Sequence, residues 1–286
     1  MSYRTLIDAA TLGRHLNEPD WIIFDVRHEL SDGAAGRQAY DAGHIPGALF
    51  LSVDDDLSGP KTGRNGRHPL PEQRVFAARL ASLGVGDSTQ VVAYDAHGGM
   101  FATRLWWMLR WLGHERVAVL DGGWPAWLQA AQPQSQRPAA PHTPGQLTLR
   151  PPLTRQVDAD IVLSRLGSPD QQVVDARAAD RFRGENETLD PVGGHIPGAA
   201  NRFFKDNLDA QQRFKPAEEL RREWLAVMGH SDARRVVAQC GSGITACHNL
   251  LALELAGLAG AALYPGSWSE WCADPARPVA RGADPA

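Results

Sequence analysis

Residues 43–48 read GHIPGA, and the same six letters return at residues 194–199. Six consecutive identities exceed what chance gives for two unrelated segments, and three further blocks recur in the same order. These blocks are DVR at 25–27 (DAR at 175–177), VVAYD at 91–95 (VVAQC at 236–240) and the tryptophans at 124 and 127 (268 and 271). Repeated blocks in a fixed order at a nearly constant offset indicate two copies of one domain.

A proline-rich segment separates the two copies. Residues 131–145 hold four prolines and show no apolar periodicity, which is typical of a stiff linker. The chain has 286 residues, enough for two domains of ordinary size. The sequence therefore predicts a first domain over residues 1–130, a linker over residues 131–150 and a second domain over residues 151–286.

Each copy has the pattern of an α/β domain. Short apolar runs predict buried parallel strands, and apolar residues at helical spacing follow the middle run of each copy. The predicted strands are residues 21–26, 91–94 and 117–120 in the first copy and residues 172–176, 236–239 and 261–264 in the second. The predicted helices are residues 101–112 and 246–255. The order strand, helix, strand favours a central parallel sheet flanked by helices on both faces.

The composition limits the classes of partner and compartment. The chain has 29 basic and 33 acidic residues, a formal net charge of −4, which gives no support for a nucleic-acid or membrane partner. Three cysteines without a C-x-x-C spacing indicate a reducing compartment. The opening residues lack the pattern of a signal peptide, and no apolar run approaches the ~20 residues that span a bilayer. We expect a soluble cytoplasmic protein.

Cys240 is the candidate nucleophile. It follows a predicted strand and opens the loop CGSGITA at residues 240–246, directly before a predicted helix. Ligands of such sheets lie beyond the carboxyl ends of the strands. Two glycines let the loop turn its N–H groups inward, and the helix N-terminus also favours a negative charge. The same loop suits a sulfur anion and the outer sulfur of a persulfide. In the first copy Asp95 stands at the matching position, whereas Cys247 and Cys272 are interpreted as structural.

These motifs together resemble the tandem form of the rhodanese family over nearly the whole chain. The resemblance rests on both GHIPGA blocks, the DGGWPAW segment at residues 121–127 and the Cys240 loop. It implies two rhodanese-like domains, a catalytic second one and a non-catalytic first one. Asp95 in place of a cysteine agrees with that division.

The loop sequence also resembles the 3-mercaptopyruvate sulfurtransferase branch of this family. Gly241 and Ser242 follow the cysteine, where thiosulfate-using members have basic residues. The branch implies sulfur transfer from 3-mercaptopyruvate through a Cys240 persulfide, with release of pyruvate. Gly241, Gly243, Ile244 and Thr245 are then expected around the substrate sulfur. The acceptor is expected to be a small thiol, a thioredoxin-like protein or cyanide, and no metal or organic cofactor is implied.

The same resemblance assigns further residues. It implies a proton relay of Asp54, His68 and Ser242, and it makes Arg181 the residue that binds the substrate carboxylate. The branch usually has a second arginine shortly before the second GHIPGA block, but residues 184–192 contain none. Arg183 is one candidate for that role.

Three repeated residues are interpreted as structural. Arg177 repeats Arg27 of the first copy, so a salt bridge explains it better than catalysis. His44 and His195 also stand in both copies, including the copy without a cysteine, which favours a role in stabilising the turn.

Three alternatives remain open at this stage. A thiosulfate sulfurtransferase would use the same fold and the same nucleophile. A phosphatase with an anion-binding cysteine loop would need an arginine six residues after the cysteine, where this chain has Ala246. A non-enzymatic binding module is disfavoured by the intact Cys240 loop.

Overall fold

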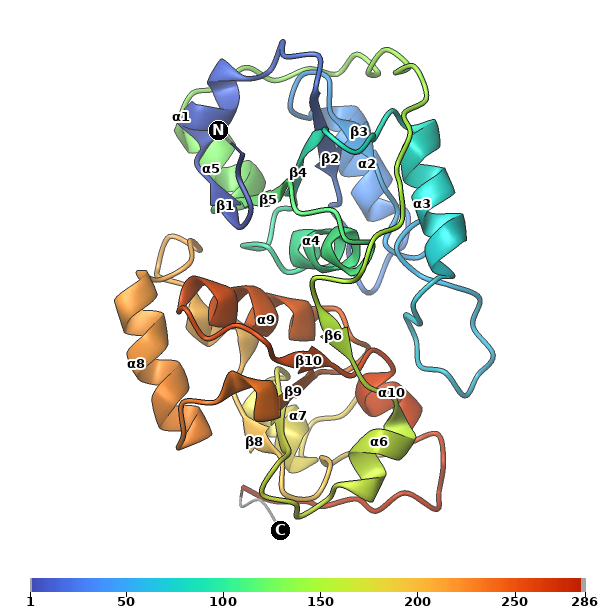
Figure 1. Ribbon diagram of the computed structural model, residues 1–286, viewed down its shortest axis with the longest axis vertical. Helices are drawn as coiled ribbons and strands as arrows, with labels where there is room; N and C mark the ends of the chain where they lie inside the picture. The colour runs from blue at the N-terminus through green and yellow to red at the C-terminus, as the bar shows by residue number, and fades with distance from the viewer. Residues whose placement is uncertain (1, 284–286) are drawn as a thin grey trace. The chain divides into compact units, whose positions relative to one another are not determined.

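The structure is a computed structural model that describes residues 2–283 (Figure 1). Contacts divide the chain into two compact units. The first unit comprises Met1–Gly59, Pro71–Leu153 and Ala210–Phe214, and the second comprises Pro60–Leu70, Thr154–Asp209 and Lys215–Ala286. The boundaries 1–130, 131–150 and 151–286 stay a prediction from the sequence. The short segment Pro60–Leu70 is notable because it belongs with the second half of the chain.

The first unit is built on a parallel sheet whose strand order is β1-β5-β4-β2-β3. The strands are β1 (Leu6–Ile7), β2 (Trp21–Asp25), β3 (Leu49–Phe50), β4 (Gln90–Tyr94) and β5 (Val117–Leu120). Every residue of β2, β4 and β5 is buried, as expected for apolar strands covered on both faces. The register pairs Ile22 with Val91 and Val92 with Ala118.

Helices cover both faces of this sheet. They are α1 (Ala9–Arg14), α2 (Ala35–Ala42), α3 (Gln73–Ser82), α4 (Ala102–Trp111) and α5 (Gly123–Gln129). On one face α1 and α5 lie side by side (Figure 1), and Leu12 and Trp127 pack there with Ile23 and Leu120. Helix α4 contacts β4 and β5. Because strand side chains alternate in direction, both faces contribute to the core.

The second unit repeats the arrangement, with strand order β6-β10-β9-β7-β8 and parallel pairing. Its strands are β6 (Arg155–Gln156), β7 (Gln172–Asp175), β8 (Ala200–Asn201), β9 (Val236–Gln239) and β10 (Ala262–Leu263). Its helices are α6 (Ala159–Ser164), α7 (Ala179–Arg183), α8 (Ala217–Met228), α9 (Thr245–Leu255) and α10 (Ser267–Trp271), with 3-10 turns η1 (Phe204–Asn207) and η2 (Ala233–Arg235). The predicted α/β class with two parallel sheets flanked by helices is confirmed.

A buried ion pair lies at the carboxyl end of β2 in the first sheet. The Arg27 guanidinium donates to both carboxylate oxygens of Asp25 and, over 2.6 Å, to the carbonyl of Gly43 in the first GHIPGA block. The same guanidinium lies 4.8 Å from the ring centroid of Trp124. Tyr94 donates a further hydrogen bond of 2.6 Å to Asp25. This buried ion pair therefore holds together three parts of the unit: the end of β2, the GHIPGA turn and the start of α5.

The second unit holds the same arrangement. Arg177 donates to Asp175 over 2.7 Å and to the Gly194 carbonyl over 2.6 Å, and it lies 4.7 Å from the Trp268 ring centroid. Burial opposes the charge of Arg177, but the carboxylates of Asp175, Glu187 and Asp190 together outweigh burial, so the pKa of Arg177 is raised. The interpretation of Arg177 as half of a structural salt bridge agrees with these contacts.

The two repeated histidines stabilise the turns they belong to. His44 Nδ1 lies 2.8 Å from the Tyr40 carbonyl oxygen, and its ring stacks on Tyr40 with centroids 3.9 Å apart. His195 Nδ1 lies 2.9 Å from the Phe182 carbonyl oxygen, and its ring stacks on Phe182 at 3.8 Å. Both side chains are fully buried, which agrees with a structural role.

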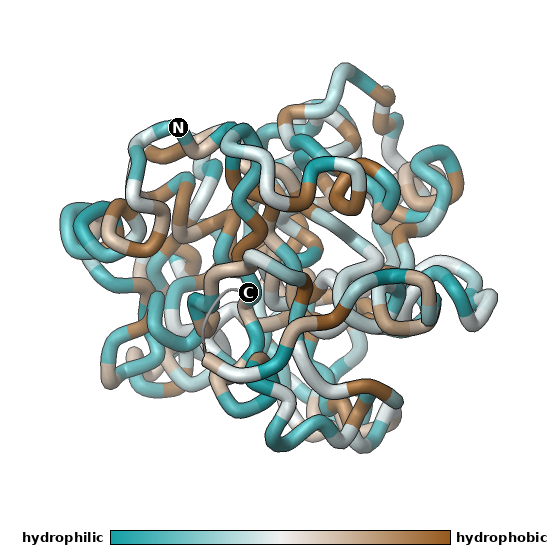
Figure 2. The backbone as a smooth tube through the Cα atoms, turned by 90° about the horizontal axis from the view of Figure 1, so that it is seen from below, coloured by the Kyte–Doolittle hydropathy of each residue, from teal (hydrophilic) through white to brown (hydrophobic). Residues whose placement is uncertain are grey.

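Among the described residues, no helix combines the length and the apolar character that crossing a membrane requires. Figure 2 shows the same property along the backbone, where apolar stretches are short and alternate with polar ones.

Replacing Asp25 by alanine should destabilise the fold strongly. Breaking a buried ion pair leaves an uncompensated charge, so the free energy of unfolding should fall by about 3–5 kcal/mol. Denaturant unfolding followed by tryptophan fluorescence measures the change. The control is Asp41→Ala, because Asp41 pairs with Arg37 at an exposed site and should cost about 1 kcal/mol or less. Equal losses in the two variants would contradict the role given to Asp25.

Candidate active site

Cys240 lies in the connection between β9 and α9, at the carboxyl edge of the second sheet. Both the backbone N–H and the backbone carbonyl of Cys240 form hydrogen bonds. The Cys240 N–H donates to Ser267 Oγ over 3.1 Å, and the Cys240 carbonyl accepts from the Trp268 N–H over 3.0 Å. The neighbouring Gly241 carbonyl accepts from the Ser269 N–H over 2.9 Å. Helix α10 therefore fixes the position of the cysteine.

The sulfur of Cys240 is buried and contacts the loop backbone. Its residue is 2% exposed, and the Gly243 N–H donates to Sγ over 3.1 Å. Gly243 has φ +79°, and a Cβ atom there would lie 2.3 Å from the Pro265 carbonyl oxygen. Only glycine fits this combination of backbone angle and close approach. The Gly243 N–H can therefore point at the Cys240 sulfur only because position 243 is a glycine.

The matching loop of the first unit holds a carboxylate. Asp95 is fully buried, and its two oxygens accept four backbone N–H groups at 2.7–3.0 Å. The donors are His97, Gly99, Phe101 and Ala102. This type of strand-to-helix loop therefore concentrates N–H groups on one negatively charged group, as the glycines and helix start of the Cys240 loop predict.

Ser242 and His68 form a direct contact within the second unit. His68 Nδ1 lies 2.7 Å from Ser242 Oγ, and both residues are buried. His68 reaches Ser242 because the segment Pro60–Leu70 belongs to this unit. Ser242 stands two residues after Cys240, so the pair lies close to this cysteine along the chain.

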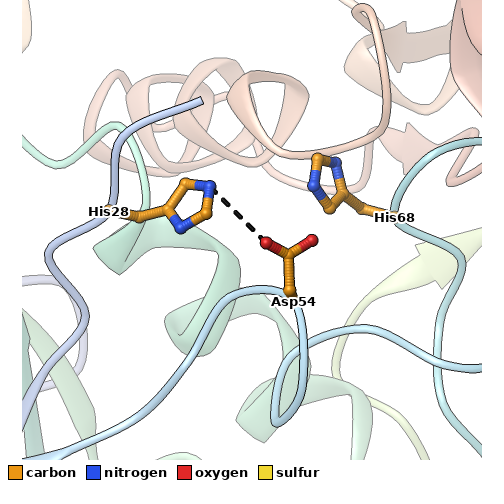
Figure 3. A group of neighbouring side chains, drawn as sticks. All are labelled: His28, Asp54 and His68. Carbon is orange, nitrogen blue, oxygen red and sulfur yellow. Dashed lines mark ion pairs between the residues drawn. The ribbon is translucent and has the colours of Figure 1, made fainter. Parts of the chain in front are cut away.

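Asp54 belongs to the first unit, where its described neighbour is a histidine. His28 Nε2 lies 4.0 Å from one Asp54 carboxylate oxygen, the pair that the dashed line joins in Figure 3. His28 is buried, whereas the Asp54 side chain is 36% exposed. The relay of Asp54 with His68 and Ser242 stays a prediction from the resemblance.

Arg181 extends from α7 and is held by a buried carboxylate. Its Nε and Nη2 atoms donate to Glu187 over 2.8–3.1 Å. Glu187 also accepts from the N–H groups of Leu189 and Asp190. Burial disfavours the charged form of Glu187, but the hydrogen bonds from Arg181 and this backbone outweigh burial, so the pKa of Glu187 is lowered. Arg181 keeps its place through a carboxylate that stays ionised.

A second arginine, for which the sequence gives no signal, stands beside the Cys240 loop. Arg67 forms an ion pair with Asp190, and a Cβ atom on Gly241 would lie 2.8 Å from Arg67 Nη2. The alternative candidate, Arg183, pairs instead with the exposed Glu185 at 2.7 Å. Arg67 stands directly before His68 in the sequence, but no local pattern signals where the segment lies.

The remaining loop residues and cysteines have mainly structural surroundings. Ile244 precedes the first turn of α9 and Thr245 begins it, and both are buried. Cys247 donates from Sγ to the Gly243 carbonyl over 3.3 Å. Burial raises the pKa of the Cys272 thiol to about 11, which disfavours its thiolate. These contacts agree with the interpretation of Cys247 and Cys272 as structural.

Two matching units, each with a strand-to-helix loop whose backbone N–H groups donate to a buried side chain, define a tandem α/β protein of the rhodanese type. The family model described as "Rhodanese-like domain" matches residues 8–130 and again residues 158–274. The chain belongs to the rhodanese family, and it is an enzyme of the sulfurtransferase class.

Similar proteins support this assignment over the full length. A probable 3-mercaptopyruvate sulfurtransferase from Pseudomonas aeruginosa is 45% identical over 284 residues, covering 99% of this chain and 100% of the relative. A thiosulfate sulfurtransferase from Cricetulus griseus is 34% identical, covering 94% and 92%. The crystal structure of SseA from Escherichia coli, a 3-mercaptopyruvate sulfotransferase, is 31% identical with a TM-score of 0.79, covering 92% and 98%.

Replacing Gly243 by alanine should disturb the Cys240 loop more than its backbone angle alone explains. The left-handed angle costs about 1–2 kcal/mol for a residue with Cβ, and the approach to Pro265 adds a steric clash. Gly198→Ala is the matched control, because Gly198 has φ +76° with no atom within 4 Å of a Cβ. Thermal unfolding and sulfurtransferase activity should both fall further in Gly243→Ala. Similar losses in the two variants would contradict the clash.

Proposed function

We propose that this enzyme moves sulfane sulfur from 3-mercaptopyruvate through a persulfide on Cys240 to an acceptor, with release of pyruvate. The observation that carries the proposal is the surroundings of one sulfur atom. Cys240 Sγ accepts an N–H from Gly243, and the guanidinium groups of Arg67 and Arg181 lie around the adjacent Gly241. A nucleophile, an anion-stabilising donor and cationic groups for a substrate carboxylate are thus close together.

The first half-reaction begins with the Cys240 thiolate. Its sulfur attacks the sulfur of the donor, and an S–S bond forms while the C–S bond of the donor breaks. The electron pair of that bond passes to the carbon and is delocalised onto the neighbouring carbonyl as an enolate. The enolate takes one proton and becomes pyruvate, and the outer sulfur stays on Cys240 as a persulfide. Backbone N–H groups of residues 241–246 favour the negative charge on this sulfur.

We infer that Ser242 and His68 supply the proton. Their contact of 2.7 Å allows a proton to move between hydroxyl and imidazole, and both groups are protected from bulk water. By resemblance Asp54 orients the imidazole, in the way that a carboxylate fixes a histidine tautomer in catalytic triads.

The second half-reaction transfers the outer sulfur to an acceptor nucleophile. A thiolate or cyanide attacks the outer sulfur, and the S–S bond breaks with its electron pair returning to Cys240 as thiolate. The products are the persulfide of the acceptor, or thiocyanate. We propose a small thiol, a thioredoxin-like protein or cyanide as acceptor and a cytoplasmic location, as the sequence predicts.

The choice of donor rests on the loop and on similarity. Gly241 and Ser242 stand where thiosulfate-using members have basic residues, and the relatives from Pseudomonas aeruginosa and Escherichia coli carry the mercaptopyruvate name. Thiosulfate is the second candidate donor, because a relative with that name covers the chain almost as fully.

Incubation with 3-mercaptopyruvate should add one sulfur atom to the peptide that contains Cys240. Mass spectrometry of the intact protein and of its peptides detects the added sulfur. Cys240→Ser should remain unmodified, whereas Cys247→Ser and Cys272→Ser should take up sulfur as the wild type does. Sulfur on another cysteine, or none with either donor, would exclude the proposed intermediate.

Steady-state kinetics should favour 3-mercaptopyruvate over thiosulfate by at least about tenfold in kcat/KM, a difference of about 1.4 kcal/mol in transition-state binding. The reason is that Gly241 and Ser242 offer no basic side chain directly after the cysteine, where thiosulfate-using members have one. Both donors are assayed with cyanide as the common acceptor. A tenfold preference for thiosulfate would replace the proposed donor by the second candidate.

A further inference from the structure

One serine of α10 joins the two segments that bring His68 and Ser242 together. The Ser269 N–H donates to the Gly241 carbonyl over 2.9 Å, and the Ser269 hydroxyl oxygen accepts the Arg67 N–H over 3.0 Å. Gly241 directly precedes Ser242 in the sequence. Arg67 directly precedes His68. Ser269 therefore binds the backbone one residue before each member of the hydrogen-bonded pair.

The segment Pro60–Leu70, which carries His68, has no regular secondary structure to hold it in place. No helix or strand lies within this segment. In the described part of the chain, the backbone groups of residues 62–67 hydrogen-bond only within the segment, except for the bond from Arg67 to Ser269. His68 is the next residue, so its backbone is fixed from this side by the serine hydroxyl.

The serine side chain is itself fixed in direction. Its hydroxyl donates to the Gly266 carbonyl over 3.3 Å, which leaves an oxygen lone pair for the Arg67 N–H. Ser269 is buried, so these bonds are protected from bulk water. Gly66 has φ +84°, and a Cβ atom there would lie 2.7 Å from the Gly266 carbonyl oxygen and 3.1 Å from Ser269 Oγ. The segment and the start of α10 therefore pack in direct contact around this hydroxyl.

We propose that Ser269 is a positioning residue for the proton transfer and that it acts through His68. The Ser269 hydroxyl holds the backbone beside His68, and this keeps the imidazole 2.7 Å from Ser242 Oγ. Proton transfer depends steeply on such a distance, so loss of the hydroxyl slows protonation of the enolate. The Cys240 loop keeps its bonds to the backbone of α10 in that case, because they do not involve the serine side chain. This inference rests on the proposed function.

The two candidate donors differ in their need for this proton. Cleavage of the C–S bond of 3-mercaptopyruvate leaves an enolate, whose carbon must take a proton to give pyruvate. Cleavage of the S–S bond of thiosulfate leaves sulfite, a stable anion that departs without a proton on carbon. A defect in proton transfer therefore slows persulfide formation from mercaptopyruvate and spares persulfide formation from thiosulfate. A distorted Cys240 loop would instead slow both.

The test measures the rate constant of persulfide formation on Cys240 with each donor, by rapid mixing, quenching and mass spectrometry. With saturating mercaptopyruvate, this rate constant should fall by about tenfold to hundredfold in Ser269→Ala, because the proton donor is misplaced. The mercaptopyruvate concentration that gives half of the maximal rate should change by less than about threefold, because ground-state binding is kept. The rate constant with thiosulfate should also stay within about threefold of the wild-type value.

Ser164→Ala is the matched control. The Ser164 hydroxyl donates to the Ile161 carbonyl over 3.0 Å, three residues earlier in the chain, as the Ser269 hydroxyl does with Gly266. Ser164 lies on the exposed side of α6, and within the described residues it accepts no N–H from a distant segment. Its replacement should leave the rate constants for both donors unchanged. Thermal unfolding of each variant verifies that it is folded at the assay temperature.

A double-mutant cycle tests whether Ser269 acts through His68. His68→Ala should lower the rate constant with mercaptopyruvate by about hundredfold or more, the usual contribution of a general acid. Adding Ser269→Ala to His68→Ala should cost less than about threefold further, because the group that the serine positions is already gone. Losses that multiply in the double variant, or equal losses for both donors in Ser269→Ala, would overturn the role of Ser269.

The outcomes separate this inference from the proposed function. If the wild type forms no persulfide with mercaptopyruvate, the proposed function fails. If His68→Ala forms the persulfide at the wild-type rate, the proton transfer through His68 fails, and the role of Ser269 fails with it. If the wild type and His68→Ala behave as expected but Ser269→Ala keeps the wild-type rate constant, only the role of Ser269 is overturned.

Discussion

A carboxylate and a guanidinium two residues apart at the end of one strand organise each half of this molecule. Asp25 with Arg27, and Asp175 with Arg177, are buried pairs whose arginines also bind the first glycine carbonyl of a GHIPGA turn and face a tryptophan. Such a pair is costly to desolvate, so it persists only where geometry satisfies nearly every donor. These contacts fix the strand end, the turn and the tryptophan-bearing helix relative to each other. The loops at this edge of each sheet connect to these fixed elements, so their positions are fixed as well.

The sequence was sufficient for the architecture because the relevant signals are local. Apolar runs such as residues 91–94 and 236–239 predict buried strands without knowledge of the strands they pair with. Because the chain holds two copies of the domain, each of these patterns is seen twice. The interpretation of Arg177, His44 and His195 as structural also came from the repeat, since a residue kept in the copy without a cysteine serves the fold. Their buried, hydrogen-bonded surroundings follow the same reasoning.

The site was harder to predict from the sequence, because its charged residues come from segments that are far apart in the chain. Nothing near Arg67 in the sequence indicates that Pro60–Leu70 belongs to the second unit, so the sequence gives no signal that this guanidinium lies beside Gly241. Glu187 and Asp190 hold this guanidinium and that of Arg181 in place, and a carboxylate that positions a cation has no local signature. The family resemblance pointed to His68 and Ser242, which contact each other in the structure. The chemical properties of these two residues, taken singly, would not have singled them out.

The Asp95 loop has a consequence of its own. Four N–H donors surround a carboxylate that is covalently part of the chain, so the ligand is tethered to its receptor. A tethered ligand has an effective concentration that dilute sulfur donors do not reach, and the loop of the first unit is permanently occupied. Aspartate at this position therefore does more than leave the first unit without a nucleophile. The Asp95 loop is a self-saturated anchor, whose N–H donors contribute to the folding of the domain and bind no separate ligand.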